Sequence, residues 1–310
     1  MNVLVQTAMR KLREARYLAG AGHILATDPV VTFDEDVVIF SMIGTRVVLP
    51  YLVAAKSLYL HLQRGRFAIL DDGTLTAQDR ATIRTHLDDP EIFDIADVDT
   101  ASCPKGGCWE RLFKLLELRR NAYVIQLDSD TVTLGPVPDV IAAIEQGRNF
   151  TLKGEADSRW MTVADFALIR PYYDPMDPQT HVQDVAEALL ERIDANLPSP
   201  RYYARGCAGF SGFAPGGFDT AIPQQFSQEI EAIVGREVWS RWGSEQVMSN
   251  VIVANEGEPL LLPYDRYLNY WNQPVPDKAA LVHFIGTYRY HRGAYADATA
   301  KAIAMLGSNR

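Results

Sequence analysis

Strand-like and helix-like segments alternate through the first half of this sequence, and that alternation limits the folds open to it. Four short apolar runs have the length and composition of buried strands, at residues 37–41, 67–70, 92–95 and 123–127. Helical periodicity fills the intervals, over 47–62, from Thr76 onward and from Trp109 onward. Strands that alternate with helices predict a Rossmann-like α/β fold, with a mainly parallel central sheet flanked by helices.

The second half of the chain is less regular. It predicts helices over 182–193, through 229–234 and from Ser244, and short strands at 260–262 and 281–284. A glycine-rich apolar stretch occupies 206–217, and we interpret the loop-rich 154–200 segment as an insertion or a lid. Thr76 with Asp79 three residues later predicts a capping box at a helix start.

Composition narrows the possible partners. The formal net charge of -9 disfavours a general nucleic-acid surface, which needs a basic footprint. Three cysteines, Cys103, Cys108 and Cys207, are too few and too sparse for a disulfide framework, so we expect reduced thiols and a cytoplasmic protein. The start of the chain predicts an amphipathic helix without a signal-peptide core, and we expect no membrane span, with peripheral membrane contact left open.

The sharpest local signal is the segment 124–136, VIQLDSDTVTLGP. Asp128 and Asp130 follow a buried strand two residues apart, so both carboxylates can face one pocket at the carboxyl edge of the sheet. Hard cations such as Mn²⁺ or Mg²⁺ bind oxygen ligands of this kind and leave positions for substrate phosphates. The alternative interpretation is an Asp-Ser-Asp turn that caps the next segment.

A second signal lies near the C-terminal end, in LVHFIGTYRYHRG at 281–293. His283 ends a predicted strand, Gly286 permits a close backbone approach, and Arg289 supplies a fixed cation. An imidazole can complete a Mn²⁺ shell, and a guanidinium binds phosphate oxygens in a bidentate way. Alone, His283 would more often be a core histidine; beside the aspartate pair it predicts a metal ligand.

These motifs together resemble the retaining glycosyltransferases of the GT-A fold, in particular family eight, the glycogenin and bacterial galactosyltransferase group. Four segments match that family's motifs in order, over roughly residues 37–292: Trp109-Glu110-Arg111-Leu112, Asp128-Ser129-Asp130, Glu245-Gln246 and His283-x-x-Gly286-x-x-Arg289. The resemblance implies one glycosyltransferase domain over 1–310. It would have an N-terminal helical extension (1–35), a nucleotide-sugar-binding half (36–150) and an acceptor-side half (151–310).

The resemblance also implies residue roles. Asp128, Asp130 and His283 would hold Mn²⁺ or Mg²⁺ against the diphosphate of a nucleotide-sugar donor, with UDP favoured. Arg111 and Arg289, with Gly286 beside the phosphates, would contact the donor. Gln246 would lie beneath the anomeric carbon and Glu245 would bind sugar hydroxyls, so that Gln246, Glu245 and Asp130 form the catalytic set. The implied reaction is transfer to a hydroxyl acceptor with retention of configuration.

Several departures from that pattern leave the donor open. The first strand ends in Ser41-Met42-Ile43-Gly44 in place of the usual base- and ribose-reading residues, so the donor contacts there are assigned to Ser41, Gly44, Thr45 and Asp72. Arg289 replaces a lysine, Glu245 replaces an aspartate, and Cys207 replaces the asparagine of an Asn-Ala-Gly segment.

Three other functions remain open from the sequence. An inverting transferase would need a carboxylate base, for which Asp157 or Asp165 is available. A nucleotidyltransferase would share the sheet, although the run SMIGTR is poor in glycine and basic residues. A catalytically weak nucleotide-sugar binder would keep the metal site. An aromatic acceptor cleft is a further hypothesis, drawn from Trp160, Tyr172, Tyr173, Tyr202, Tyr203, Tyr270 and Trp271.

Overall fold

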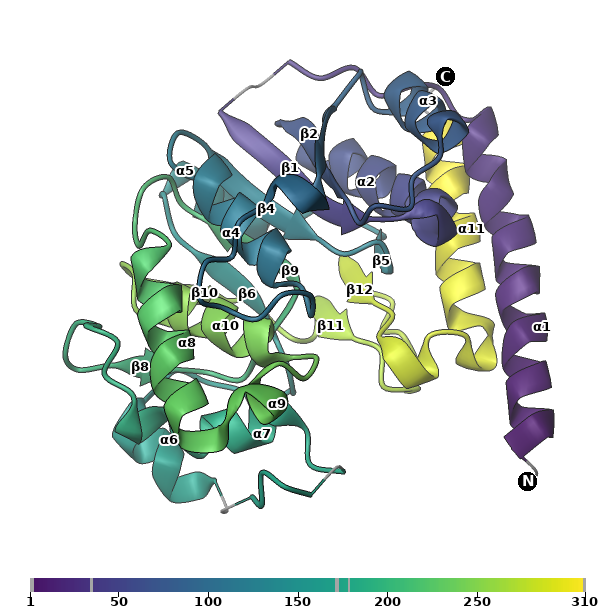
Figure 1. The fold of residues 1–310 in the computed structure, drawn as a ribbon. Helices are drawn as coiled ribbons and strands as arrows, with labels where there is room; N and C mark the ends of the chain where they lie inside the picture. Colours follow the sequence, from purple (N-terminus) through teal and green to yellow (C-terminus); the bar gives the residue numbers. More distant parts are fainter. Residues whose placement is uncertain (1–2, 34–35, 171–172, 178, 309–310) are drawn as a thin grey trace.

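A seven-stranded sheet forms the centre of the protein in a computed structural model that describes residues 3–33, 36–170, 173–177 and 179–308 (Figure 1). The strand order is β10-β6-β9-β4-β1-β2-β3. The strands span Val37–Ile43 (β1), Arg66–Asp71 (β2), Glu91–Asp94 (β3), Tyr123–Leu127 (β4), Phe150–Lys153 (β6), Gly206–Phe213 (β9) and Leu260–Leu261 (β10). The four strands expected in the first half are therefore confirmed.

The sheet is parallel except at β9. Strands β1, β2, β3 and β4 run parallel, and β9 lies antiparallel between β4 and β6. The glycine-rich 206–217 stretch thus supplies a fully buried central strand. Its pairing with β6 is irregular, because Thr151 is opposite Ser211 while Leu152 is opposite Cys207. Residues 208–210 bulge out of that ladder, and bulges commonly redirect backbone groups beside functional sites.

A second, three-stranded sheet adjoins the end of β4. It contains β11 (Tyr267–Asn269), β12 (Leu281–His283) and β5 (Thr131–Thr133) in that order. Strand β12 is antiparallel to β5, with His283 opposite Thr131. This pairing brings a C-terminal strand beside the loop that leaves β4. A two-stranded pair, β7 (Met161–Thr162) with β8 (Tyr202–Tyr203), lies in the second half of the chain.

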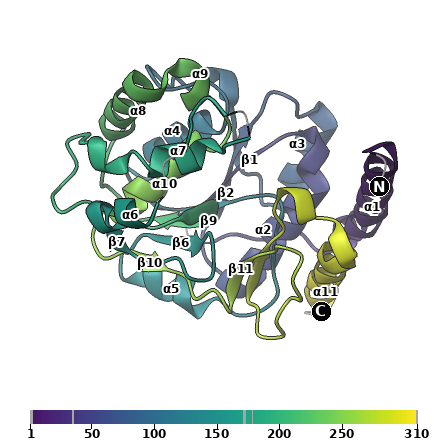
Figure 2. The same cartoon turned by 90° about the horizontal axis from the view of Figure 1, so that it is seen from below.

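Helices cover both faces of the central sheet and enclose two apolar cores (Figures 1 and 2). One core includes residues of α1 (Val3–Ala21), α2 (Val48–Leu62), α3 (Ala77–His86), α5 (Pro138–Glu145) and α11 (Ala294–Gly307). The other includes residues of α4 (Trp109–Leu118), α6 (Val163–Ile169), α7 (Val182–Glu187), α8 (Ala221–Val234), α9 (Arg236–Trp239) and α10 (Ser244–Ala254). Helices α1 and α11 lie side by side along one edge of the molecule.

A local sequence signal correctly predicts the start of one helix. Thr76 and Asp79 form the expected capping box at the start of α3. The helix expected over 182–193 is wrong in length, because α7 ends at Glu187 and a separate 3-10 turn follows at Leu190–Arg192. Beyond that turn the amide of Asp194 donates to Glu229 of α8, which ties the segment to that helix. Among the described residues, no helix is both long enough and apolar enough to span a membrane.

A buried lysine–histidine contact joins α2 to α3. Lys56 Nζ lies 3.3 Å from His86 Nδ1 and donates to Thr27 Oγ1 at 2.6 Å. Burial lowers the pKa of Lys56 to about 8. The pKa of His86 is lowered first by burial and then by the positive charge of Lys56. The folded protein therefore binds fewer protons at His86 than the unfolded chain does near the ordinary histidine pKa.

We predict that acid destabilises the protein in part through His86. Stability that is present above about pH 6.5, the ordinary histidine pKa, should fall as the pH drops below it. Urea unfolding at pH 7.5 and pH 5.5 measures this loss, and the His86→Gln variant should lose less free energy of unfolding than the wild type. His23 is exposed, so His23→Gln is the control. Equal losses in all three proteins would contradict the prediction.

Candidate active site

The predicted site residues gather at one cavity of about 390 Å³ beyond the carboxyl end of β4. Eight of them line it: Arg111, Asp128, Asp130, Glu245, Gln246, His283, Gly286 and Arg289. They come from α4, the β4–β5 loop, the start of α10 and the segment after β12. The fold therefore brings together, in three dimensions, four motifs that lie far apart in the sequence.

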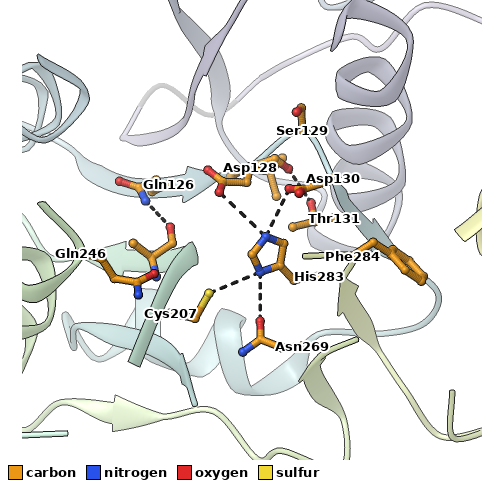
Figure 3. A network of polar contacts seen from close by, with 12 residues as sticks. Gln126, Asp128, Ser129, Asp130, Thr131, Cys207, Gln246, Asn269, His283 and Phe284 are labelled. Atoms are coloured by element: carbon orange, nitrogen blue, oxygen red, sulfur yellow. Dashed lines mark hydrogen bonds and ion pairs between the residues drawn. The ribbon is translucent and has the colours of Figure 1, made fainter. Parts of the chain in front are cut away.

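Backbone hydrogen bonds fix the loop that carries the two aspartates. The amide of Asp128 donates to Gly209 O at 2.8 Å, which ties the loop to β9. The carbonyl of Asp130 accepts from the amide of Phe284 at 2.8 Å, which ties it to the residue after β12. His283, next to Phe284, is thereby held facing both carboxylates, as Figure 3 shows. The loop conformation thus depends on strands from the C-terminal half.

Each aspartate divides its two oxygens between an arginine and the histidine. Asp128 accepts from Arg111 through Oδ1 at 2.5 Å, while its Oδ2 lies 3.9 Å from His283 Nε2. Asp130 accepts from Arg289 through Oδ2, while its Oδ1 lies 3.2 Å from His283 Nε2. The two inner oxygens and the imidazole nitrogen therefore converge, and the guanidiniums stay on the outer oxygens.

Asn269 determines which nitrogen of His283 faces the carboxylates. The Asn269 amide nitrogen donates to Lys153 O at 2.9 Å and to Gly154 O at 3.2 Å, so its oxygen faces the imidazole. His283 Nδ1 lies 2.9 Å from that oxygen and 3.3 Å from Cys207 Sγ. Nδ1 therefore carries a proton, and Nε2 is the nitrogen that faces the carboxylates and would bind a ligand.

The electrostatics of this group favour positive charge between the carboxylates. Burial would lower the pKa of His283, but Asp130, followed by Cys207, raises it well above the ordinary value. Burial would raise the pKa of Asp130, but His283 and Arg289 lower it. The carboxylate stays ionised in a buried position only because cations surround it.

Asp128, Asp130 and His283 fit a divalent cation. One ligand atom from each lies within 4.8 Å of the other two, and the donor set of two carboxylate oxygens and one imidazole suits Mn²⁺ or Mg²⁺. Asn269 supplies the hydrogen bond that metal-binding histidines usually make through their second nitrogen. A cation would take the place of the proton on Nε2, since histidine ligates in its neutral form.

The bulge in β9 leaves space for His283. A Cβ atom added at Gly209 would lie inside van der Waals contact of the imidazole Cε1, Nδ1 and Nε2 atoms. No larger residue fits at this position without displacing the ring. The segment Cys207-Ala208-Gly209 therefore matters for its backbone and its lack of bulk, and Cys207 adds the sulfur contact to Nδ1.

Arg111 links the aspartate loop to the start of α10. Its Nη2 donates to Glu245 Oε2 at 3.1 Å, while Nη1 donates to Asp128. Glu245 is buried, and its pKa is raised by burial, against the opposing charge of Arg111. Trp109 Nε1 donates to Ser244 Oγ at 2.9 Å, which holds α4 against α10. Glu245 Oε2 is thus paired with Arg111 while its buried Oε1 has no hydrogen-bond partner among the described residues, and its expected contact with sugar hydroxyls stays a prediction.

The residues predicted at the ends of β1 and β2 lie outside this cavity lining. Ser41 is fully buried and donates to Leu127 O at 2.7 Å, so its hydroxyl has a structural partner. Thr45 N donates to Thr74 Oγ1 at 3.0 Å, and Asp72 accepts from the Thr74 amide at 3.0 Å. Gly44 packs so closely on Asp72 that a Cβ would overlap the carboxylate. Donor contacts by Ser41, Gly44, Thr45 and Asp72 remain predictions.

The aromatic residues proposed for an acceptor cleft separate into two groups. Tyr203 and Tyr270 are buried in the cores, whereas Trp271 is 49% exposed and lines the cavity. Trp242, which the sequence analysis did not single out, is 71% exposed and also lines it. Tyr172 lies outside the described residues. Trp160 and Tyr173 are half-buried and Tyr202 is exposed, and none of these three lines the cavity.

The sequence analysis also missed three residues that orient other site residues or line the cavity. Asn269 orients His283, and Gln183 bonds to Gln246, while Arg205 lines the cavity wall. None of them belongs to a recognisable motif. The only sequence signal for Gln183 is its i, i+4 spacing to Glu187 on a predicted helix.

Comparison with known proteins supports the fold. No protein-family model matches the sequence, and the search of curated proteins gives no match. The structure is similar to that of the bifunctional glycosyltransferase WbbM, with a TM-score of 0.52 and 15% identity over 89% of this chain and 51% of that chain. The chain therefore spans about half the length of WbbM. The architecture, a mostly parallel central sheet flanked by helices, is of the GT-A type that the sequence predicts.

Two further similarities are weaker. The galactosyltransferase LgtC, in complex with donor and acceptor sugar analogues, gives a TM-score of 0.47 at 12% identity, over 87% of this chain and 95% of that chain. The glycosyltransferase GlyE of Streptococcus pneumoniae TIGR4 gives 0.49 at 11% identity, over 89% of this chain and 64% of that chain.

We predict that Gly209→Ala abolishes or strongly weakens Mn²⁺ binding, because the new methyl displaces His283. Titration calorimetry with Mn²⁺ should show at least about a tenfold rise in Kd, the size of effect that loss of a supporting residue produces. Gly135 has open space around it, so Gly135→Ala is the matched control and should bind like the wild type. Unchanged Mn²⁺ affinity in Gly209→Ala would contradict the placement of His283 as a ligand.

Proposed function

We propose that this protein is a metal-dependent glycosyltransferase. It transfers a sugar from a nucleotide diphosphate donor, with UDP favoured, to a hydroxyl acceptor, with retention of configuration. The observation that carries the proposal is the convergence of Asp128, Asp130 and His283 with two arginines on one cavity of a GT-A fold. Three metal-ligating atoms beside two fixed cations form a suitable site for a diphosphate.

A bound cation would neutralise the charge that develops on the diphosphate leaving group. Arg289 supports the same task, because Phe284 O and the outer oxygen of Asp130 hold its guanidinium at the cavity wall. Arg111 is held similarly between Asp128 and Glu245. Both arginines are positioned before substrate arrives, so that little reorganisation is needed when charge develops.

Gln246 supports retention in place of a carboxylate nucleophile. It lines the cavity one residue after Glu245, whose carboxylate is paired with Arg111. An amide is a poor nucleophile, but its carbonyl oxygen can stabilise positive charge at an anomeric carbon. The arrangement therefore favours attack on the same face as the departing phosphate, with the protein supplying positioning and electrostatics.

One observation favours an inverting reaction as a second candidate. Glu155 is an exposed carboxylate that lines the cavity and is the residue an inverting mechanism would use as its base. Asp165 instead caps α6 through Thr162, and Asp157 does not line the cavity. The anomeric configuration of the product separates the two reactions, and Glu155→Gln should abolish only the inverting one.

We predict that the protein with Mn²⁺ releases nucleoside diphosphate from one member of a panel of UDP-, GDP- and ADP-sugars. Free nucleotide is followed by a coupled assay. Asp130→Ala and an excess of chelator should each lower the rate by about a hundredfold or more, in line with loss of a principal electrostatic group. The Asp165→Ala variant, altered at a helix cap outside the cavity, should retain activity.

Two outcomes would count against this proposal. Donor turnover that persists in chelator and in Asp130→Ala would place the chemistry elsewhere. Metal-dependent thermal stabilisation by a nucleotide sugar without any turnover, with hydroxyl acceptors present, would instead identify a nucleotide-sugar-binding protein.

A further inference from the structure

A buried glutamate lies behind the cavity. Glu187 ends α7 and has no exposed surface. Its Oε2 accepts from Arg205 Nη1 at 2.6 Å and lies 3.5 Å from Arg170 Nη2. Burial raises the pKa of Glu187, and the two guanidiniums oppose that rise. With two cations beside it, the side chain is a carboxylate whose oxygens act only as acceptors.

That carboxylate fixes the orientation of Gln183. Gln183 lies one turn earlier on α7 and is 3% exposed. Its amide nitrogen donates to Glu187 Oε1 at 2.9 Å, and Tyr203 Oη donates to the same oxygen at 3.0 Å. Because the glutamate offers no donor, the Gln183 amide cannot reverse without facing oxygen with oxygen. Its Oε1 therefore points away from Glu187.

The orientation of the Gln183 amide in turn determines that of the Gln246 amide. Gln183 Oε1 accepts from Gln246 Nε2 at 2.8 Å, so the amide nitrogen of Gln246 is directed to α7. Gln246 Oε1 accepts from the amide of Ala208 at 3.2 Å. A reversed Gln246 would place its NH₂ against the Ala208 N–H and its oxygen against Gln183 Oε1, which loses both hydrogen bonds.

The bulge in β9 makes this last contact possible. Ala208 lies between Cys207 and Ser211, in the segment that leaves the ladder with β6, so its backbone is open to side chains. Its carbonyl accepts from Gln126 Nε2 while its amide donates to Gln246. The backbone at Ala208 is thus held from both sides, and it presents a fixed donor to Gln246.

We propose that Glu187 and Gln183 are positioning residues that hold the Gln246 amide in one of its two orientations, with its carbonyl oxygen at the cavity. This inference rests on the role given to Gln246 in the proposed transferase reaction. A carbonyl oxygen directed in this way presents negative partial charge to the anomeric carbon as positive charge develops there. Glu187 acts through the side-chain amides of Gln183 and Gln246 and does not itself contact the donor.

A double-mutant cycle tests the link. Glu187→Gln keeps the shape but adds a donor, so Gln183 can reverse, and Gln246 then loses either its hydrogen bond to Gln183 or, if it also reverses, its hydrogen bond from Ala208. It should lower kcat about tenfold, with little change in the donor KM. Gln246→Ala should lower kcat at least as much. In the Gln246→Ala background, Glu187→Gln should have no further effect on kcat, because the residue through which it acts is gone.

Controls separate positioning from stability. Gln183→Met removes the relay and leaves the ion pairs of Glu187 intact, and it should reproduce the loss of kcat with a near-normal Tm. Glu256→Gln removes another partly buried carboxylate, which pairs with Arg119 at 2.7 Å outside the cavity lining. It should lower Tm and leave kcat unchanged. Loss of kcat in Glu256→Gln that matches its loss of Tm would overturn the inference.

A readout without catalysis makes the test independent of the donor assay. In protein labelled with ¹⁵N at glutamine side chains, the Gln246 amide resonances should shift in Glu187→Gln and stay unchanged in Glu256→Gln. Unshifted resonances in Glu187→Gln would overturn the inference. It would also be overturned if the loss of kcat in the double variant equalled the product of the losses in the two single variants. Absence of donor turnover in the wild type would instead count against the proposed function. The Gln246 resonances would still show whether Glu187 positions Gln246 through Gln183.

Discussion

The balance of charge in one buried cavity is the constraint on which the rest of the site depends. The cavity holds three neighbouring carboxylates, of which Asp130 and Glu245 are buried with little solvent to stabilise them and Asp128 is half-buried. Arg111 and Arg289 neutralise the outer oxygens, and His283 faces the inner ones. Removing Arg111 would leave the buried Glu245 carboxylate without its counter-charge, and breaking a buried pair in this way typically costs about 3–5 kcal/mol.

The fold meets this requirement by joining the two halves of the chain. Strand β4 delivers the aspartates at its carboxyl end, where α/β sheets commonly bind ligands. Strand β12 pairs with β5, and this pairing places His283 opposite Thr131, beside the two aspartates. The bulged β9 lies between them and combines a close approach at Gly209 with a free backbone amide at Ala208. The proposed metal-binding and sugar-facing parts of the site thus share one irregular strand.

The sequence predicted much of this, and the physical reasons are visible. The four parallel strands are short apolar runs buried on both faces, and the capping box of α3 is a local signal. Asp128, Asp130 and His283 were found because their residue types carry a specific chemistry. The antiparallel direction of β9 was not predicted, because strand direction depends on pairing partners that are distant in sequence.

The supporting residues could not be predicted for a related reason. Asn269 and Gln183 act by orienting another side chain, and an asparagine or glutamine in a sequence does not indicate what its amide faces. The break after α7 is likewise followed by a contact between the Asp194 amide and Glu229 of α8. Such features depend on tertiary context, which periodicity and propensity do not contain.

The most direct test of the central claim is anomalous diffraction from a crystal grown with MnCl₂ and a nucleoside diphosphate. We predict one Mn²⁺ peak bounded by Asp128, Asp130 and the Nε2 atom of His283, with the diphosphate beside Arg289. A cavity without a peak, or a Mn²⁺ ion bound away from these three side chains while the diphosphate occupies the cavity, would contradict the account.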